Sequence, residues 1–336
     1  MPMIAGLRRT IRRTARHTAR RTVRRAAAVA AAAAPVAALA PAAHAAPAVT
    51  AAVVVDVKLT GTGVTVHEKT ADPVKVTSYT LGNVAYLRRN GRFAKQIGYQ
   101  EITVAPKGRR AVAVPTTYVN DHDSVLLADL TANTGSKVQT VARPLIAKFA
   151  HWSRDGAKAV LTVQRKNGTS WDTIGFAVVD AAARTTRAVT VPGADRAARF
   201  RWGPGGTEVV TEHQGGTRFY GLDGRVRRTF AKTGAPAGGE DAFSPSGSAF
   251  LTWCPLTYAE PVCVWNRTTG ALSAKVNIRA QALLGWWDDR HLIAVVPSGT
   301  AYRAVVADLT GRSTRVLADI PAADWKARVY LSYTRP

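Results

Sequence analysis

Trp152-Ser153-Arg154-Asp155-Gly156 is the stretch on which the fold depends, together with the apolar run 159–163 that follows it. An aromatic residue ends one strand, a polar turn closed by Gly reverses the chain, and a second strand follows. The chain repeats this unit several times. Variants occupy residues 104–108, 202–206, 243–247 and, in a more degenerate form, 286–290.

The copies recur at a nearly constant period. The turn glycines at positions 108, 156, 206 and 247 are 48, 50 and 41 residues apart, and Arg290 holds the equivalent place 43 residues later. Each unit ends in a further strand, and these five strands are expected at 138–141, 188–191, 226–230, 272–276 and 314–317. Four strands in a unit of about 40–50 residues is the period of a β-propeller blade. No long run shows helical periodicity, so the sequence predicts an all-β fold.

The turns at 152–156 and 243–247 resemble the S-P-D-G turn of TolB-like and WD-repeat propeller proteins. This resemblance covers residues 100–320, in five units, and implies the propeller fold. It implies no particular activity, because propellers carry unrelated functions. The Trp-Asp pair that gives WD repeats their name is missing from its usual strand position. No segment suggests the separate N-terminal domain of the periplasmic TolB protein, so its Pal-binding role is not implied.

Five full units leave residues over at both ends of the chain. Runs 74–80, 84–89 and 93–97 are expected to form three strands before the first unit, and 327–333 one strand after the last. Joined, they make a blade to which both termini contribute, which removes the open edges of a linear array. We therefore predict six four-stranded blades, the last closed by both termini. The alternatives are five blades with an accessory hairpin, or seven with the runs 53–59 and 64–68 contributing; those two runs would otherwise pair with each other.

Residues 1–45 are predicted to be an export signal. Paired arginines at 8–9, 12–13, 20–21 and 24–25 precede an uncharged Ala-rich segment, and Ala43-His44-Ala45 offers the small residues that signal peptidase requires. The apolar segment is short and broken by Pro35, so it does not predict a transmembrane helix. The twin-arginine route and the general route both stay open. We expect a secreted protein with one domain over 46–336, and the leader resembles those of high-GC actinobacteria in composition.

The chain is strongly basic, with a formal net charge of +24. Nine arginines and no acid lie in residues 1–45, so +15 belongs to the remainder. A basic surface attracts polyanions such as anionic wall polymers. No basic run interleaved with aromatics indicates specific nucleic-acid binding, and scattered charge that keeps the protein soluble is the alternative. We expect a monomer with no membrane span in the mature chain and at most weak attraction to the cell wall.

The two cysteines point to one disulfide. Cys254 ends a strand of the fourth unit and Cys263 begins the next strand, with eight residues between them. Facing positions on neighbouring antiparallel strands come within disulfide reach, and exported proteins retain such bonds. A reactive or metal-binding pair is the alternative, but two sulfurs with no nearby His or further Cys make a poor zinc site.

No catalytic, metal or cofactor site is predicted. The sequence holds neither a G-x-S-x-G elbow nor an H-E-x-x-H helix. The polar clusters 120–124 and 238–241 contain groups that bind divalent cations, but we expect both to be solvated turns. The repeated aromatic position is expected to pack between blades, and its members are Trp152, Trp202, Phe243 and Trp286. Three tryptophans off this register could stack on a sugar or peptide at a rim: Trp171, Trp287 and Trp325.

Two functions remain open. The leading hypothesis is a secreted, non-enzymatic propeller whose loops or central channel bind or scaffold a protein, peptide or glycan partner. The alternative is a propeller enzyme, a glycan-cleaving hydrolase or lyase, with acids or histidines that converge at the channel mouth. Two or more such groups within about 6 Å of each other would favour the enzyme. A channel lined by small or apolar residues would favour the binder. A third possibility, electrostatic attachment to a wall polymer, predicts release at moderate salt.

Overall fold

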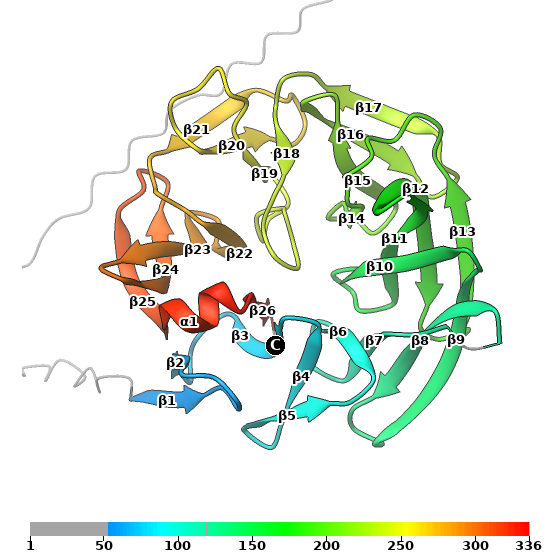
Figure 1. Cartoon of the computed structure of the whole chain (residues 1–336). Helices are drawn as coiled ribbons and strands as arrows, with labels where there is room; N and C mark the ends of the chain where they lie inside the picture. The colour runs from blue at the N-terminus through cyan, green and yellow to red at the C-terminus, as the bar shows by residue number, and fades with distance from the viewer. Residues whose placement is uncertain (1–52, 119, 336) are drawn as a thin grey trace, which may run out of the picture. The chain divides into compact units, whose positions relative to one another are not determined.

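The computed structural model describes residues 53–118 and 120–335, and the predicted leader lies outside them. The described chain consists almost entirely of strands, which form six sheets around a central channel (Figure 1). This arrangement confirms the predicted six-bladed β-propeller. One short helix, α1 (Ala322–Lys326), lies in the described part of the chain. None of the helical structure described there is long and apolar enough to cross a bilayer.

Blades 1 to 3 each contain four antiparallel strands, which follow one another from the channel outward. Blade 1 comprises β26 (Val329–Thr334), β3 (Lys75–Leu81), β4 (Val84–Arg89) and β5 (Arg92–Gln96). Blade 2 comprises β6 (Tyr99–Val104), β7 (Arg110–Pro115), β8 (His122–Asp129) and β9 (Thr134–Ala142). Blade 3 comprises β10 (Leu145–Trp152), β11 (Lys158–Asn167), β12 (Ser170–Asp180) and β13 (Thr185–Thr190).

Blades 4 to 6 repeat the same order. Blade 4 comprises β14 (Arg201–Trp202), β15 (Glu208–His213), β16 (Gly216–Gly221) and β17 (Val226–Phe230). Blade 5 comprises β18 (Ala235–Pro236), β19 (Ala249–Trp253), β20 (Val262–Asn266) and β21 (Leu272–Val276). Blade 6 comprises β22 (Ala282–Asp288), β23 (His291–Ser298), β24 (Ala301–Asp308) and β25 (Ser313–Ile320).

Both ends of the described chain contribute to closing the ring. Strand β26 pairs with β3 along its whole length, so the first blade takes its innermost strand from the C-terminal end. The runs 53–59 and 64–68 form a hairpin of β1 (Val54–Lys58) and β2 (Thr65–Lys69) rather than a seventh blade. Strand β2 joins the outer strand of blade 6, and Arg88 of blade 1 holds Glu68 of β2 at 2.6 Å. The hairpin therefore contacts both blades and connects blade 6 to blade 1.

The hydrophobic core is divided into six clusters, each between two neighbouring blades. Each sheet buries apolar side chains on both faces, which explains runs of Val, Ala and Leu without strict alternation. The largest cluster lies between blades 6 and 1 and also takes in Leu59, Val64 and Val66 from the hairpin. Stability therefore resides in contacts between blades rather than in one central core.

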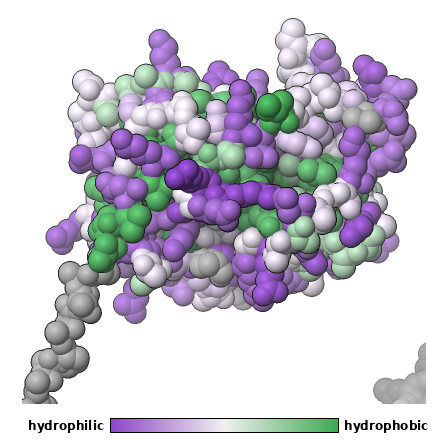
Figure 2. All heavy atoms as spheres, turned by 90° about the horizontal axis from the view of Figure 1, so that it is seen from below, coloured by the Kyte–Doolittle hydropathy of each residue, from purple (hydrophilic) through white to green (hydrophobic). Residues whose placement is uncertain are grey.

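The side of the ring seen in Figure 2 is mostly hydrophilic. A hydrophobic patch interrupts it where the described chain begins, and Val53, Val54 and Val55 are 75%, 51% and 53% exposed there. Strand β1 also forms the free edge of its six-stranded sheet. Exposed valines on an unpaired edge are a pattern that favours association with a further strand.

Candidate functional site

The repeated turns lie at one end of the ring, which we call the turn end. Their glycines at positions 108, 156, 206 and 247 have φ values between 65° and 73°, which Gly adopts readily because it lacks a Cβ. The residue before each turn is buried: Val104 in blade 2, and an aromatic residue in blades 3 to 6, tryptophan in three of them. Three of these indoles donate to a carbonyl of the preceding blade: Trp152 to Thr103 at 3.0 Å, Trp202 to His151 at 2.9 Å and Trp286 to Ala242 at 3.1 Å. The repeated aromatics therefore join neighbouring blades.

Charged groups at the turn end are engaged with one another. Arg154, from the turn of blade 3, donates to Asp241 at 2.7 Å and to three carbonyl oxygens of residues 243–245. Arg335 donates to two carbonyl oxygens of β22 at 2.9 Å each. These three charged residues line a cavity of about 260 Å³, together with Glu240 and with Lys107, whose amine makes no hydrogen bond within the described chain. Arg154, Asp241 and Arg335 are thus engaged in hydrogen bonds that connect parts of the protein itself.

The opposite end of the channel carries the turns that join the second and third strands of each blade. We call it the hairpin end after these turns, and the name does not refer to the hairpin of β1 and β2. A cavity of about 370 Å³, the channel cavity, lies there beside the β3–β4 turn. Such a volume is typical of small-molecule sites. Side chains from the innermost strands of blades 1 to 4 line it, including Glu101, Lys148, His151, Arg199, Arg201 and Tyr330.

A second cavity of about 290 Å³ adjoins the channel cavity. Arg199, Arg201 and Tyr330 line both cavities, so they stand at the boundary between them. Glu212 and Trp253 line the second cavity from blades 4 and 5. Because Cys254 follows Trp253 directly, the loop that begins there belongs to the same end of the ring.

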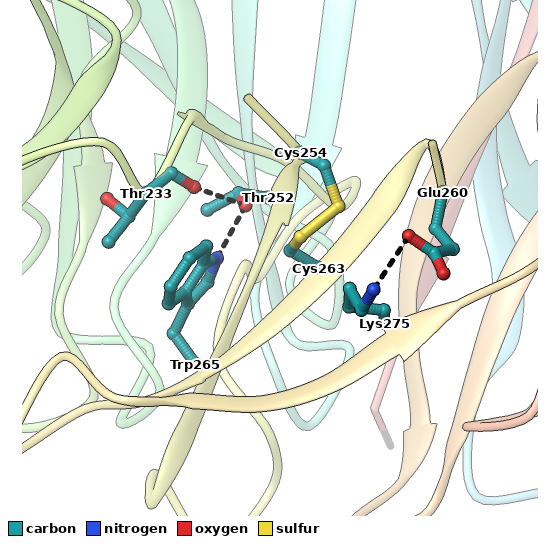
Figure 3. The surroundings of a disulfide bond; sticks show 7 residues. All are labelled: Thr233, Thr252, Cys254, Glu260, Cys263, Trp265 and Lys275. Atoms are coloured by element: carbon teal, nitrogen blue, oxygen red, sulfur yellow. Dashed lines mark hydrogen bonds and ion pairs between the residues drawn. A yellow bond between two sulfur atoms is a disulfide. The ribbon is translucent and has the colours of Figure 1, made fainter. Parts of the chain in front are cut away.

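A disulfide closes the loop between β19 and β20. It joins Cys254 to Cys263, whose Cα atoms are 5.0 Å apart (Figure 3). Glu260, within the loop, forms an ion pair with Lys275 of β21 at 3.2 Å. Leu256 is fully exposed in the same loop. The bond and the ion pair thus hold an exposed loop in place at the hairpin end.

Glu101 fixes the backbone of the inner strand β10. Its Oε2 accepts a hydrogen bond from the N–H of Phe149 at 2.9 Å, and its Oε1 accepts one from the N–H of Ala150 at 2.6 Å. The pairing of β10 is irregular there, and Phe149 has a φ of 57°, which costs energy in a residue other than Gly. Burial raises the pKa of Glu101 to about 7, although the two N–H donors lower it, and the Glu240 charge raises it further.

His151 and Glu240 lie close together in the channel cavity. The Nδ1 of His151 lies 3.7 Å from the Oε2 of Glu240, and it has no hydrogen-bond partner among the described residues. Thr103 donates to the same Glu240 oxygen at 2.6 Å. Burial lowers the pKa of His151 and the Arg201 charge lowers it further, so the imidazole is neutral at neutral pH. The separation of 3.7 Å between the two side chains is shorter than the distance of about 6 Å named above, so this pair counts in favour of the enzyme alternative.

The prediction of solvated turns is confirmed for Asn120 and Asp121, which are exposed turn residues, but it is wrong for Asp123 and for 238–241. Within 238–241, Glu240 lines the channel cavity and Asp241 pairs with Arg154. Within 120–124, Asp123 is buried and accepts a hydrogen bond from the N–H of Ala147 in the next blade at 2.7 Å. Both segments lie against neighbouring blades, and local sequence does not reveal such contacts. Among the described residues, no three His, Cys, Asp or Glu side chains form a group that could hold a metal ion.

The three tryptophans off the repeat register do not line the cavities described above. Trp325 packs on Tyr302 with ring centroids 4.8 Å apart. Trp287 packs against the cluster between blades 6 and 1, and the Arg315 guanidinium lies 5.2 Å from its ring. Trp171 lies in β12 and is partly buried. Sequence reasoning instead missed Arg199, Arg201 and Tyr330, which do line the channel.

No protein-family model and no curated protein matches this chain. Similar solved structures include the putative TolB from Agrobacterium tumefaciens, 10% identical with a TM-score of 0.46, over 78% of this chain and 98% of that one. The β-propeller domain of the Trilobed protease from Pyrococcus furiosus is 11% identical, with a TM-score of 0.47 over 79% and 84%. A functionally unknown protein from Desulfotomaculum acetoxidans is 13% identical, with a TM-score of 0.48 over 82% and 98%. The likeness concerns the fold alone.

Proposed function

We propose that this chain is an exported, non-enzymatic β-propeller that binds a ligand in the channel cavity at the hairpin end. The supporting observation is a cavity of about 370 Å³ with unengaged polar groups. Within the described chain, the Lys148 amine, the Arg199 guanidinium and the Tyr330 hydroxyl that line it make no hydrogen bond. Polar groups that converge on a cavity without internal partners are those that orient a ligand.

Export is supported by two features. The leader combines paired arginines, an Ala-rich segment and small residues at the expected cleavage position. The disulfide between Cys254 and Cys263 adds support, because such bonds persist in oxidising compartments. We propose that the ligand is presented by a glycan, peptide or protein outside the cytoplasm.

A glycan-cleaving enzyme is the second candidate, because Glu101, Glu240 and His151 line the same cavity. A carboxyl group with a pKa of about 7 is suited to donate a proton at neutral pH. However, both oxygens of Glu101 accept backbone N–H groups, and one oxygen of Glu240 accepts the Thr103 hydroxyl. Because these acids already support the inner strands, we rank binding above catalysis.

Native mass spectrometry with a mixed library of oligosaccharides and short peptides tests both candidates. A binder gives intact adducts that are lost in Tyr330→Ala and kept in Val226→Ala, a matched change on the outer strand β17, where Val226 is 52% exposed. Product masses that disappear in Glu240→Gln would favour the enzyme instead. Adducts that survive Tyr330→Ala would contradict a channel site.

A further inference from the structure

Two arginines enter the channel from the innermost segment of blade 4. Arg199 and Arg201 are separated by Phe200, which is fully buried between blades 3 and 4, so both arginines point to the opposite, channel side. The Nη1 of Arg201 donates to the carbonyl oxygens of Gly238 and Gly239, which fixes the guanidinium. Within the described chain, the other nitrogens of Arg201 make no hydrogen bond.

Arg199 is held in place without using its hydrogen-bond donors. Its Cζ lies 3.9 Å from the centroid of the Phe149 ring. Phe149 is in turn fixed by Glu101, which accepts its backbone N–H at 2.9 Å. A guanidinium stacked on a ring keeps its N–H groups directed outward from its edge. Arg199 is therefore ordered in advance, which reduces the entropy lost when a ligand binds.

The channel cavity carries an excess of positive charge. Lys148, Arg199 and Arg201 supply three cations, whereas only two acids line the cavity, Glu101 and Glu240, and Glu101 with its pKa of about 7 is only partly ionised at neutral pH. Burial lowers the pKa of Arg201, and the Arg199 charge lowers it further, as expected for cations that are incompletely compensated. Two other acids lie nearby: Glu212 in the adjoining cavity, which interacts with Asp195, and Asp123, which interacts with Lys148. This excess favours an anionic ligand, and the arrangement of the donors decides which anion fits.

We propose that the channel cavity binds a carboxylate group, held between Arg199 and Arg201, with the Tyr330 hydroxyl as a further donor. The inference rests on the proposed channel-binding function and gives the chemistry of its ligand. A guanidinium presents paired N–H groups that match the two oxygens of a carboxylate. A cavity of about 370 Å³ admits such a group together with one sugar ring or one amino-acid residue.

Isothermal titration calorimetry with matched probes tests the inference. The pairs are D-glucuronate with D-glucose, and N-acetylglycine with N-acetylglycinamide. We expect at least one acid to bind about tenfold more tightly than its neutral counterpart. Arg199→Gln should remove this preference, and so should Arg201→Gln if that more buried variant folds. Arg225→Gln is the matched control, because it removes the same charge from a side chain that is 86% exposed in a turn of blade 4.

The outcomes separate this inference from the broader function. The acid that binds identifies the carboxylate source as a sugar or a peptide end. The inference is overturned if Arg199→Gln keeps the preference, if neither acid binds better than its neutral counterpart, or if inorganic phosphate binds more tightly than both. If neutral probes bind as tightly as the acids and lose binding in Tyr330→Ala, the channel site is supported and only the preference for a carboxylate is contradicted. If no probe and no library member binds, both the channel-binding function and the carboxylate inference are contradicted.

Discussion

Trp202 shows how one side chain joins two blades. It is 5% exposed in the cluster between blades 3 and 4, and its Nε1 donates to the carbonyl of His151 at 2.9 Å. Trp202→Phe keeps an aromatic ring but removes the indole N–H that donates to this carbonyl. We expect the free energy of unfolding to fall by about 1–2 kcal/mol, as measured by urea unfolding. Trp171→Phe is the control, because its indole makes no hydrogen bond within the described chain; an equal loss there would contradict the explanation.

The ionisation of Glu101 should make the folded state less stable as pH rises. The pKa of Glu101 in the folded chain is about 7, above its ordinary value of 4.5, so the folded state binds more protons between these values. The resulting stabilisation is complete below about 4.5 and is lost as pH rises through about 7. Glu101→Gln should flatten the dependence of unfolding free energy on pH across this window. An unchanged slope would assign the dependence to another group.

The residues that line the channel could be predicted in position. Successive side chains of a strand point to opposite sides, so the first and third residues before the repeated aromatic share the channel side. Counting back from the turns of blades 2 to 5 gives Thr103 and Glu101, His151 and Phe149, Arg201 and Arg199, and Ala242 and Glu240. All but Ala242 line the channel cavity, whereas the same count in blade 6 gives Gly285 and Leu283, which do not.

The environment of Glu240 could not be predicted in this way. The two glycines before it are typical of a turn, which is why the sequence predicted one there. In the structure, Gly239 lies so close to blade 6 that a Cβ would meet the carbonyl oxygen of Leu284 at 2.2 Å. The glycine is needed for this close approach between blades, and no local pattern distinguishes that need from a turn.

The hairpin of β1 and β2 is fastened to blade 6 through His67. Its Nδ1 lies 2.7 Å from Asp56 of β1, and its Nε2 lies 3.0 Å from Asp319 of β25. Burial lowers the pKa of His67, but the hydrogen bonds to the two carboxylates outweigh this and raise it above 6.5. A neutral imidazole has one N–H, so it can donate to both carboxylates only when protonated.

We therefore expect the attachment of the hairpin to weaken as pH rises through the raised pKa of His67, because the stabilisation is complete only below about 6.5. Two arginines lie against the same residues: Arg303 pairs with Asp319, and Arg315 donates to the backbone carbonyl of His67. Hydrogen exchange should show protection factors of β2 amides that decrease with pH in the wild type and stay level in His67→Gln. Equal profiles would contradict the role of His67.

The disulfide should stabilise the protein by constraining its unfolded state. Replacing both Cys254 and Cys263 by Ser removes the constraint on a short loop, and we expect the free energy of unfolding to fall by about 2–3 kcal/mol. The ladder between β19 and β20 remains, so the fold should persist. Urea unfolding measures the loss. A free thiol at Cys254 in non-reduced peptides of the wild type would show that the bond is absent.

Strands were easier to predict than the one helix described. The expected strands 226–230 and 272–276 coincide with β17 and β21, because a turn with Gly, at Gly224 and Gly270, marks where each one begins. Helix α1 has only five residues, too few for a 3.6-residue period to emerge. It occupies the connection between blades 6 and 1, just before the predicted final strand.

Ring closure should depend on β26. A chain that ends at Arg328 would leave β3 without its inner partner and would lose the buried side chains of Val329, Leu331 and Tyr333. We expect this variant to aggregate, because an unpaired strand and an open hydrophobic cluster would both be exposed. Size-exclusion chromatography and circular dichroism measure the result. A monomer with the unfolding midpoint of the full chain would contradict this dependence.

The sequence repeat predicts the number of blades. It does not predict which arginines of the ring are engaged in hydrogen bonds and which line a cavity without them. Arg154 and Arg199 are alike as residue types, yet Arg154 reaches from blade 3 to blade 5 and donates to four oxygens there. Arg199 makes no hydrogen bond within the described chain and lines two cavities. This difference depends on the closed ring, which brings blade 5 within reach of Arg154 and leaves Arg199 facing the cavities.

Because β26 completes blade 1, β3 depends on a strand that lies at the opposite end of the described chain. On the ribosome β3 is made well before β26, so its inner edge stays unpaired until β26 has also emerged. A chaperone that protects the chain in this interval would recognise an extended strand, and its task would end when β26 docks.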